Sequence, residues 1–184
     1  EAAWFTHLSA SGRFPAIEAF ELPFSSGLAE PASRAFQEFV EKNAMDEFKD
    51  VKLIGVHVHG PGLIHSLQPV TKLEDMKGLK VRGGSRIINI MLEQLGATPV
   101  GMPVPAVPEA LSKGVIDGAV VPYQVVPSIK VNELVKYAAE TDPSYPALYT
   151  TVFVVAMNKA KYESLPPDLK KVLDANSGRE FSAH

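Results

Sequence analysis

The sequence predicts an α/β protein in which helices pack on a largely parallel sheet. Within residues 75–118, short apolar strands alternate with segments of helical periodicity. Gly96 and Gly114 close the two helical segments, a position at which glycine is common. Strands that alternate with helices form layered α/β folds, and ligands in such folds bind beyond the carboxyl ends of the strands. This region is therefore the first place to look for a binding site.

Before this region, the sequence predicts two strands and a helix. A strand is expected over residues 4–8, and Pro31 opens a helix. The apolar face of that helix is formed by Ala35, Phe36, Phe39 and Val40. Residues 51–59 alternate as a strand that places His57 and His59 on one face. The Gly-Pro-Gly sequence at residues 60–62 breaks this strand and is a candidate hinge.

The central region begins with a short helical turn at residues 73–76. A strand around Leu79 and Val81 follows and stops at Gly83-Gly84, so that Arg82 lies at its end. The next helix is expected to bury one face, formed by Ile87, Ile90, Met91 and Leu95. A strand at 97–102, a helix at 105–113 and a strand at 115–121 complete this region.

The last third of the chain is predicted to contain two helices and two strands, with a polar loop between the strands. Helical signal at residues 131–135 and a strand at 136–139 lead to a polar loop at 141–146, the second candidate hinge. A strand at 149–157 and a helix from Pro166 follow. The two breaks indicate a chain that leaves one lobe, builds a second and returns. We expect lobe I to comprise residues 1–59 and 147–184, and lobe II to comprise residues 60–146.

Three motifs in the central region carry a family resemblance. They are KGLKVR at residues 77–82, LGATPV at 95–100 and EALSKGVIDG at 109–118. In this order and spacing the chain resembles the DctP family, the solute-binding proteins of tripartite ATP-independent periplasmic (TRAP) transporters. GRFP at 12–15, ELPF at 21–24 and the segment 147–173 extend the resemblance over nearly the whole chain.

The resemblance implies both a fold and a function. The implied fold is that of a type II-like periplasmic-binding protein, with two lobes joined by hinge strands and incomplete in this chain. The implied function is the capture of a small organic acid in the periplasm and its delivery to a TRAP permease in the membrane. Such a protein is not an enzyme and needs no cofactor. Two alternatives are a small α/β enzyme acting on a carboxylate substrate and a sensor module that reuses the binding fold.

Arg82 is the leading candidate for ligand binding. A guanidinium presents a planar fork of donors that matches a carboxylate in two parallel hydrogen bonds. The resemblance implies that this arginine clamps the carboxylate of the solute; the alternative is a surface arginine paired with a nearby acid. Arg86 lies in the first turn of the next helix, where a cation is disfavoured by the helix dipole. A bound anion would compensate for this, and a solvated position is the alternative.

The remaining candidate residues predict a ligand with few hydroxyl groups. Val121 stands where the sialic acid-binding branch of the family has a polar side chain, and residues 60–65 contain no second arginine. Aromatic residues that would form a wall of the pocket are Tyr123, Phe14, Trp4 and Tyr149. His59, at the first hinge, is a further candidate for ligand contact. An aromatic or branched aliphatic carboxylate fits this set.

Several other classes of function find no support in the sequence. The formal net charge is −3, and no basic block indicates nucleic acid or an anionic membrane as a partner. His57, His59 and His65 invite a metal site, but no acidic residue lies near them in sequence, so we expect no metal. The absence of cysteine excludes disulfides and thiol catalysis. The sequence contains no nucleotide-binding or hydrolase motif.

The first residues of the chain lack the basic region and apolar core of a secretory signal. Because family members are exported and longer, we expect this chain to be part of a longer protein. Lobe I would then lack some of its strands and would expose sheet edges, which readily pair with other strands. A dimer formed through those edges is the expected result.

Overall fold

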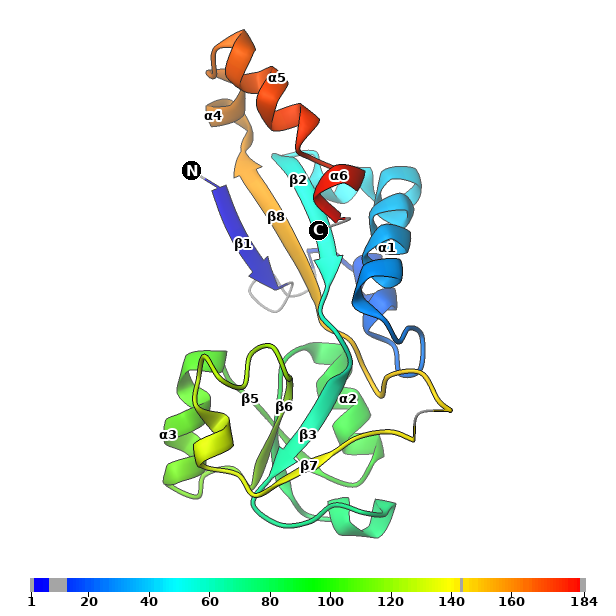
Figure 1. The fold of residues 1–184 in the computed structure, drawn as a ribbon, viewed down its shortest axis with the longest axis vertical. Coiled ribbons are helices and arrows are strands. Elements are labelled where there is room, and N and C mark those ends of the chain that lie inside the picture. Colours follow the sequence, from blue (N-terminus) through cyan, green and yellow to red (C-terminus); the bar gives the residue numbers. More distant parts are fainter. Residues whose placement is uncertain (1, 7–12, 143, 183–184) are drawn as a thin grey trace. The chain divides into compact units, whose positions relative to one another are not determined.

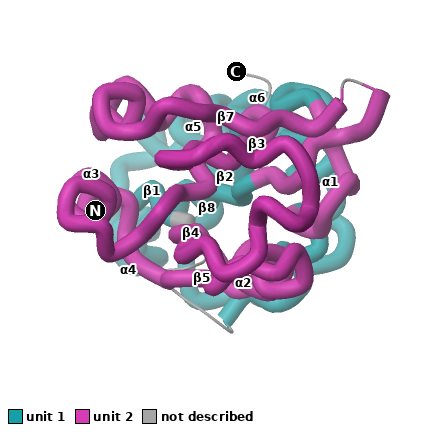
Figure 2. The backbone as a smooth tube through the Cα atoms, turned by 90° about the horizontal axis from the view of Figure 1, so that it is seen from below, with its two compact units in different colours: residues 1–20, 28–59, 151–184 teal, residues 21–27, 60–150 magenta. Residues whose placement is uncertain are grey.

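The computed structural model describes residues 2–6, 13–142 and 144–182. The chain forms two compact units, shown in two colours in Figure 2. Unit 1 comprises Glu1–Phe20, Leu28–His59 and Thr151–His184, and unit 2 comprises Glu21–Gly27 and Gly60–Thr150. Residues 21–27 thus belong to unit 2, although the sequence placed them in lobe I. That these units are the two lobes of a binding protein stays a prediction.

Unit 1 is built on a three-stranded antiparallel sheet with the order β1-β8-β2. Its strands are β1 (Ala2–Thr6), β8 (Val152–Asn158) and β2 (Val51–Val58). Helix α1 (Ala29–Asn43) covers one face, and its Phe36 and Val40 pack in the main core of the unit. The predicted end of the first strand, Leu8, lies outside the described residues. The helix predicted from Pro31 begins two residues earlier.

Shorter helices complete unit 1 (Figure 1). They are the 3₁₀ helices η2 (Ile17–Glu21) and η3 (Met45–Phe48), and the α-helices α4 (Lys159–Glu163), α5 (Pro167–Ala175) and α6 (Arg179–Ser182). Glu21, the last residue of η2, already belongs to unit 2. Helix α5 is joined to β2 by Lys52, whose Nζ lies 2.6 Å from a carboxylate oxygen of Asp174. The Lys52 ammonium also lies 4.4 Å from the centre of the Tyr162 ring, so the three side chains hold α4 and α5 against the strand.

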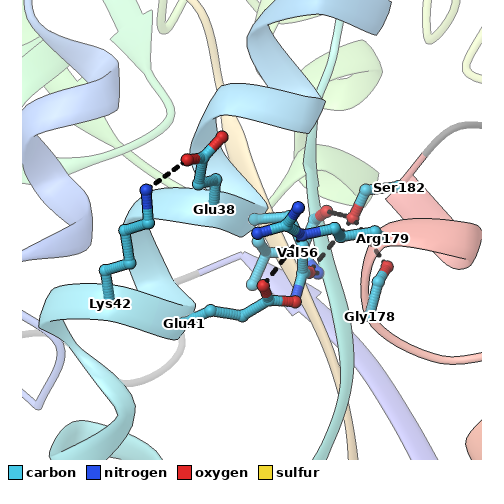
Figure 3. A network of polar contacts seen from close by, with 8 residues as sticks. Glu38, Glu41, Lys42, Val56, Gly178, Arg179 and Ser182 are labelled. Carbon is cyan, nitrogen blue, oxygen red and sulfur yellow. Dashed lines mark hydrogen bonds and ion pairs between the residues drawn. The ribbon is translucent and has the colours of Figure 1, made fainter.

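The edge of β2 that faces away from β8 is covered by the Gln37 side chain of α1 and by residues 178–182, which include α6. The Val56 N–H donates to Gln37 Oε1 over 3.0 Å, and the Val56 carbonyl accepts from Ser182 Oγ over 2.6 Å. The Gly178 N–H donates to the Ile54 carbonyl over 2.6 Å. Figure 3 shows Ser182 beside Val56, and Arg179 beside Glu41 of α1. These contacts occupy backbone groups that would otherwise be open to another strand.

Unit 2 contains a five-stranded mixed sheet with the order β5-β4-β6-β3-β7. Its strands are β3 (Gly62–Ser66), β4 (Lys80–Gly83), β5 (Thr98–Gly101), β6 (Gly118–Pro122) and β7 (Tyr137–Ala139). Strand β4 pairs in parallel with β5 and β6, whereas β3 pairs antiparallel with β6 and β7. The expectation of a largely parallel sheet is therefore correct for three strands and wrong for the other two.

The helices of unit 2 follow the predicted order. They are η4 (Leu73–Met76), α2 (Arg86–Gln94), η5 (Val104–Ala106), α3 (Val107–Ser112) and η6 (Val131–Glu133). Ser85 caps α2, because its hydroxyl accepts a hydrogen bond from the Ile88 N–H over 3.2 Å. The buried face of α2 is formed by Ile88, Met91 and Leu92. The predicted face was wrong in part, because Ile90 is 44% exposed.

Residues 21–27 are joined to unit 2 by backbone hydrogen bonds. The Phe24 N–H donates to the Ala147 carbonyl, and the Ala147 N–H donates to the Ser26 carbonyl, each over 3.0 Å. Phe24 adopts a left-handed backbone conformation, with φ of 59°. This conformation is uncommon for a bulky side chain, and here the neighbouring backbone bonds hold it in place.

Candidate ligand-binding site

Arg82 is the third residue of β4, next to the carboxyl end of the strand. Its guanidinium folds over Gly84: a Cβ atom at residue 84 would lie 3.1 Å from Arg82 Nη1. A Cβ atom at Gly83 would lie 1.8 Å from Asn89 Oδ1 of α2. The glycine pair that ends the strand therefore lets the guanidinium and the following helix approach the backbone closely.

The guanidinium is held by backbone carbonyls. Arg82 Nε donates to the Met102 carbonyl over 3.0 Å, and Nη1 donates to the Val120 carbonyl over 3.2 Å. The residue is only 4% exposed. Burial lowers the pKa of Arg82, and the nearby Tyr149 hydroxyl acts in the opposite direction. Since arginine stays protonated in proteins, the site contains a fixed and largely desolvated positive charge.

Tyr149 is the aromatic neighbour of Arg82 in unit 2. It is 1% exposed, and its ring lies directly over Gly62, where a Cβ atom would come within 2.0 Å of Cζ. Its hydroxyl donates to the Leu63 carbonyl over 3.5 Å. The sequence had placed this residue on a strand of lobe I, but β8 begins only at Val152 and Tyr149 belongs to unit 2.

Two other predicted site residues also lie in unit 2. Val121 is buried in β6, and its carbonyl accepts a hydrogen bond from His65 Nε2 over 3.1 Å. Tyr123 follows β6 and is 52% exposed, with its ring edge-on to that of His65 at 5.6 Å between centroids. From the sequence, His65 was a candidate only for a metal site. It orders the end of β6 through this hydrogen bond.

Arg86 is exposed at the first residue of α2. It is separated from Arg82 by the glycine pair and Ser85, and it lacks the burial that distinguishes Arg82. Its predicted contact with a ligand stays a prediction.

The predicted site residues of unit 1 fall into two places. Trp4 lies in a group of stacked rings with Phe153, His57 and His59, where the ring centroids of His59 and Phe153 are 4.1 Å apart. The Trp4 indole N–H donates to His57 Nε2 over 2.9 Å. Phe14, in contrast, is buried in the main core and stacks on Phe48 at 4.9 Å between centroids.

The two histidines of this ring group are kept neutral. Burial lowers the pKa of His57, and burial together with the neighbouring His57 lowers the pKa of His59 to about 4. The buried His59 Nδ1 has no hydrogen-bond partner among the described residues. Within the described ranges, no group of three or more His, Cys, Asp or Glu residues is arranged to hold a metal ion.

The sequence matches the DctP family, described as bacterial extracellular solute-binding protein, family 7, over residues 1–179. The chain belongs to this family. Within the described part of the chain, no helix is long and apolar enough to cross a bilayer.

Three similar proteins illustrate the relationship. A TRAP solute-binding protein from Rhodoferax ferrireducens, solved with copurified benzoate, is 52% identical, with a TM-score of 0.97 over 100% of this chain and 57% of that one. A marine metagenome TRAP solute-binding protein specific for aromatic acid ligands, solved with 3-hydroxybenzoate, is 50% identical, with a TM-score of 0.95 over the same shares. The 2,3-diketo-L-gulonate-binding periplasmic protein YiaO of Escherichia coli is 29% identical over 167 residues, 89% of this chain and 49% of the relative.

The chain thus belongs to the DctP family and has the type II-like fold of TRAP solute-binding proteins, and it spans about half the length of the curated relatives that it matches.

Proposed function

We propose that the protein to which this chain belongs binds an aromatic monocarboxylic acid in the periplasm and delivers it to the membrane subunits of a TRAP transporter. Arg82 binds the carboxylate. The observation that carries the proposal is the buried guanidinium of Arg82, which two backbone carbonyls hold in place. The side chain that affects its pKa is the Tyr149 hydroxyl and not a carboxylate.

The geometry of Arg82 favours an anion as its partner. Two of the five guanidinium donors are used on the Met102 and Val120 carbonyls, which fixes the plane of the group. A carbonyl is a neutral acceptor, so it satisfies the donors without neutralising the charge. A desolvated cation in this position gains most from a carboxylate that accepts two of its hydrogen bonds.

The ligand class is supported by the similar proteins. Those solved with benzoate and with 3-hydroxybenzoate share about half of their residues with this chain, at TM-scores of 0.95 or above. The apolar Val121 and the aromatic Tyr149 near Arg82 agree with a ligand that carries few hydroxyl groups.

The test is a calorimetric titration of the full-length protein with benzoate, with succinate and with D-glucuronate as comparison acids. We expect benzoate to bind, and Arg82→Ala to weaken binding by at least about 30-fold, because truncation of one partner of a buried charge pair costs about 2–5 kcal/mol. Arg82→Lys, which keeps the charge but loses the fork, should also weaken binding.

The matched control is Arg34→Ala, since Arg34 is an exposed arginine that pairs with Glu30 on α1. It should bind benzoate with unchanged affinity. Binding of succinate or glucuronate without binding of benzoate would overturn the ligand class. Unchanged affinity in both folded Arg82 variants would overturn the role of Arg82.

A further inference from the structure

The hydroxyl of Tyr149 has a long hydrogen bond in a place where water cannot replace it. The residue is 1% exposed, and the bond to the Leu63 carbonyl measures 3.5 Å, whereas O–H···O bonds are usually 2.5–3.0 Å long. Buried polar groups in folded proteins nearly always have a hydrogen-bond partner at normal distance, so the long bond of this hydroxyl needs an explanation.

Tyr149 and Arg82 approach the same pair of neighbouring strands. Arg82 Nη1 donates to the Val120 carbonyl on β6, and the Tyr149 hydroxyl donates to the Leu63 carbonyl on β3. In the antiparallel register, Leu63 lies opposite Val121, the residue after Val120. Because paired strands are about 5 Å apart, the two carbonyls lie in one small region of the sheet, and the charge of Arg82 acts on the Tyr149 hydroxyl.

The Tyr149 hydroxyl is also electrostatically suited to donate a hydrogen bond. Burial raises the pKa of Tyr149, Arg82 opposes this rise and the fully buried Glu21 adds to it. The phenol therefore stays protonated over the whole physiological range and keeps a proton that it can donate.

Gly62 fixes the position of the ring. A Cβ atom at residue 62 would lie 2.0–2.4 Å from three ring atoms of Tyr149, so the ring can lie on the strand only because residue 62 has no side chain. The backbone is joined as well, since the Gly62 N–H donates to the Tyr149 carbonyl over 3.0 Å. A ring held in this way directs its hydroxyl without a further loss of side-chain freedom on binding.

We propose that Tyr149 is a ligand-binding residue whose hydroxyl donates a hydrogen bond to the same carboxylate that Arg82 binds. This inference rests on the proposed function, and it adds a reason for selectivity. The pair supplies one cation and one neutral donor, and Arg82 is the single buried lysine or arginine among the described residues. One carboxylate is satisfied by this pair, whereas the second carboxylate of a dicarboxylic acid would meet no buried positive charge.

The experiment is a titration of full-length wild-type protein and Tyr149→Phe with benzoate. This substitution removes the hydroxyl and keeps the ring over Gly62. We expect benzoate affinity to fall about 10- to 100-fold, the usual effect of a hydrogen bond to a charged group. The melting temperature without ligand should stay the same, because a bond of 3.5 Å contributes little. Tyr145→Phe removes a hydroxyl from a residue that is 65% exposed and should change neither quantity.

The outcomes separate the inference from the proposed function. If wild type binds benzoate and Arg82→Lys weakens it, but Tyr149→Phe binds like wild type, the inference is overturned and the proposed function stands. A loss of affinity in Tyr149→Phe that comes with a lowered melting temperature also overturns it, because the hydroxyl would then act through packing. If wild type does not bind benzoate, the proposed function fails, and the inference with it.

Discussion

At the residue scale, the neutral ring group of unit 1 makes stability depend on pH. The pKa of His59 is about 4 in the folded protein, whereas it is near 6.5 in an unfolded chain. Between these values the unfolded chain takes up a proton that the folded protein does not. Stability is therefore highest above about pH 6.5, falls as the pH is lowered and stops falling on this account below about pH 4.

His59→Phe should remove this part of the pH dependence. One pKa unit corresponds to about 1.4 kcal/mol, and because the imidazole is partly exposed we expect a loss of about 1–2 kcal/mol between pH 7 and pH 4 in wild type relative to the variant. Phenylalanine keeps the stack on Phe153 but does not titrate. The measurement is urea unfolding of both proteins at several pH values, and parallel pH profiles would contradict the assignment.

At the element scale, the covered edge of β2 depends on Gln37. Its side-chain oxygen accepts hydrogen bonds from the Val56 N–H and from Ser182 Oγ, and its nitrogen donates to Glu41. Gln37→Ala would leave the buried Val56 N–H without its acceptor. We expect a loss of about 1–3 kcal/mol in the free energy of unfolding, measured by urea denaturation.

The matched control for this substitution is Gln94→Ala, at the exposed end of α2. A surface change of this kind is expected to stay within about 0.5 kcal/mol of wild type. Equal effects of the two substitutions would show that the contact with Val56 contributes nothing.

Some helices and strands could be predicted from the sequence and others could not. The alternation of residues 51–58 and the glycine pair after Arg82 place β2 and the end of β4 directly from the sequence. Strand β3 was not predicted, because it begins at the last glycine of the Gly-Pro-Gly break and its five residues are all buried, so they show no alternation. On α2, apolar residues occur in adjacent pairs such as Ile87-Ile88, so periodicity alone does not choose the buried face.

The candidate site was predictable to a similar extent. The position of Arg82 follows from local sequence, because it depends on one strand and its stop. The approach of Tyr149 depends on a chain segment that returns to unit 2 from far along the sequence. No local sequence pattern predicts that Tyr149 contacts the strand, although a glycine at residue 62 is compatible with a ring lying there.

At the scale of the whole molecule, the chain passes between the units at residues 20/21, 27/28, 59/60 and 150/151. Neither unit is one continuous segment. Residues 21–27 are held in unit 2 by the backbone bonds between Phe24, Ser26 and Ala147, which lie outside the helices and strands. We expect the amides of Phe24 and Ala147 to be protected from hydrogen exchange. Exchange at the rate of an unstructured peptide would show that this segment does not stay in place.

Trp4 is the only tryptophan of the sequence, and it lies against Phe153 with its indole N–H on His57. Intrinsic fluorescence excited in the indole band therefore reports on the ring group of unit 1. Acidification that protonates the imidazoles would quench this emission, since an imidazolium accepts electron density from an excited indole. Arg82 and Tyr149 belong to unit 2. A change in Trp4 emission on adding benzoate would therefore show that binding of the acid at Arg82 alters the surroundings of Trp4 in unit 1.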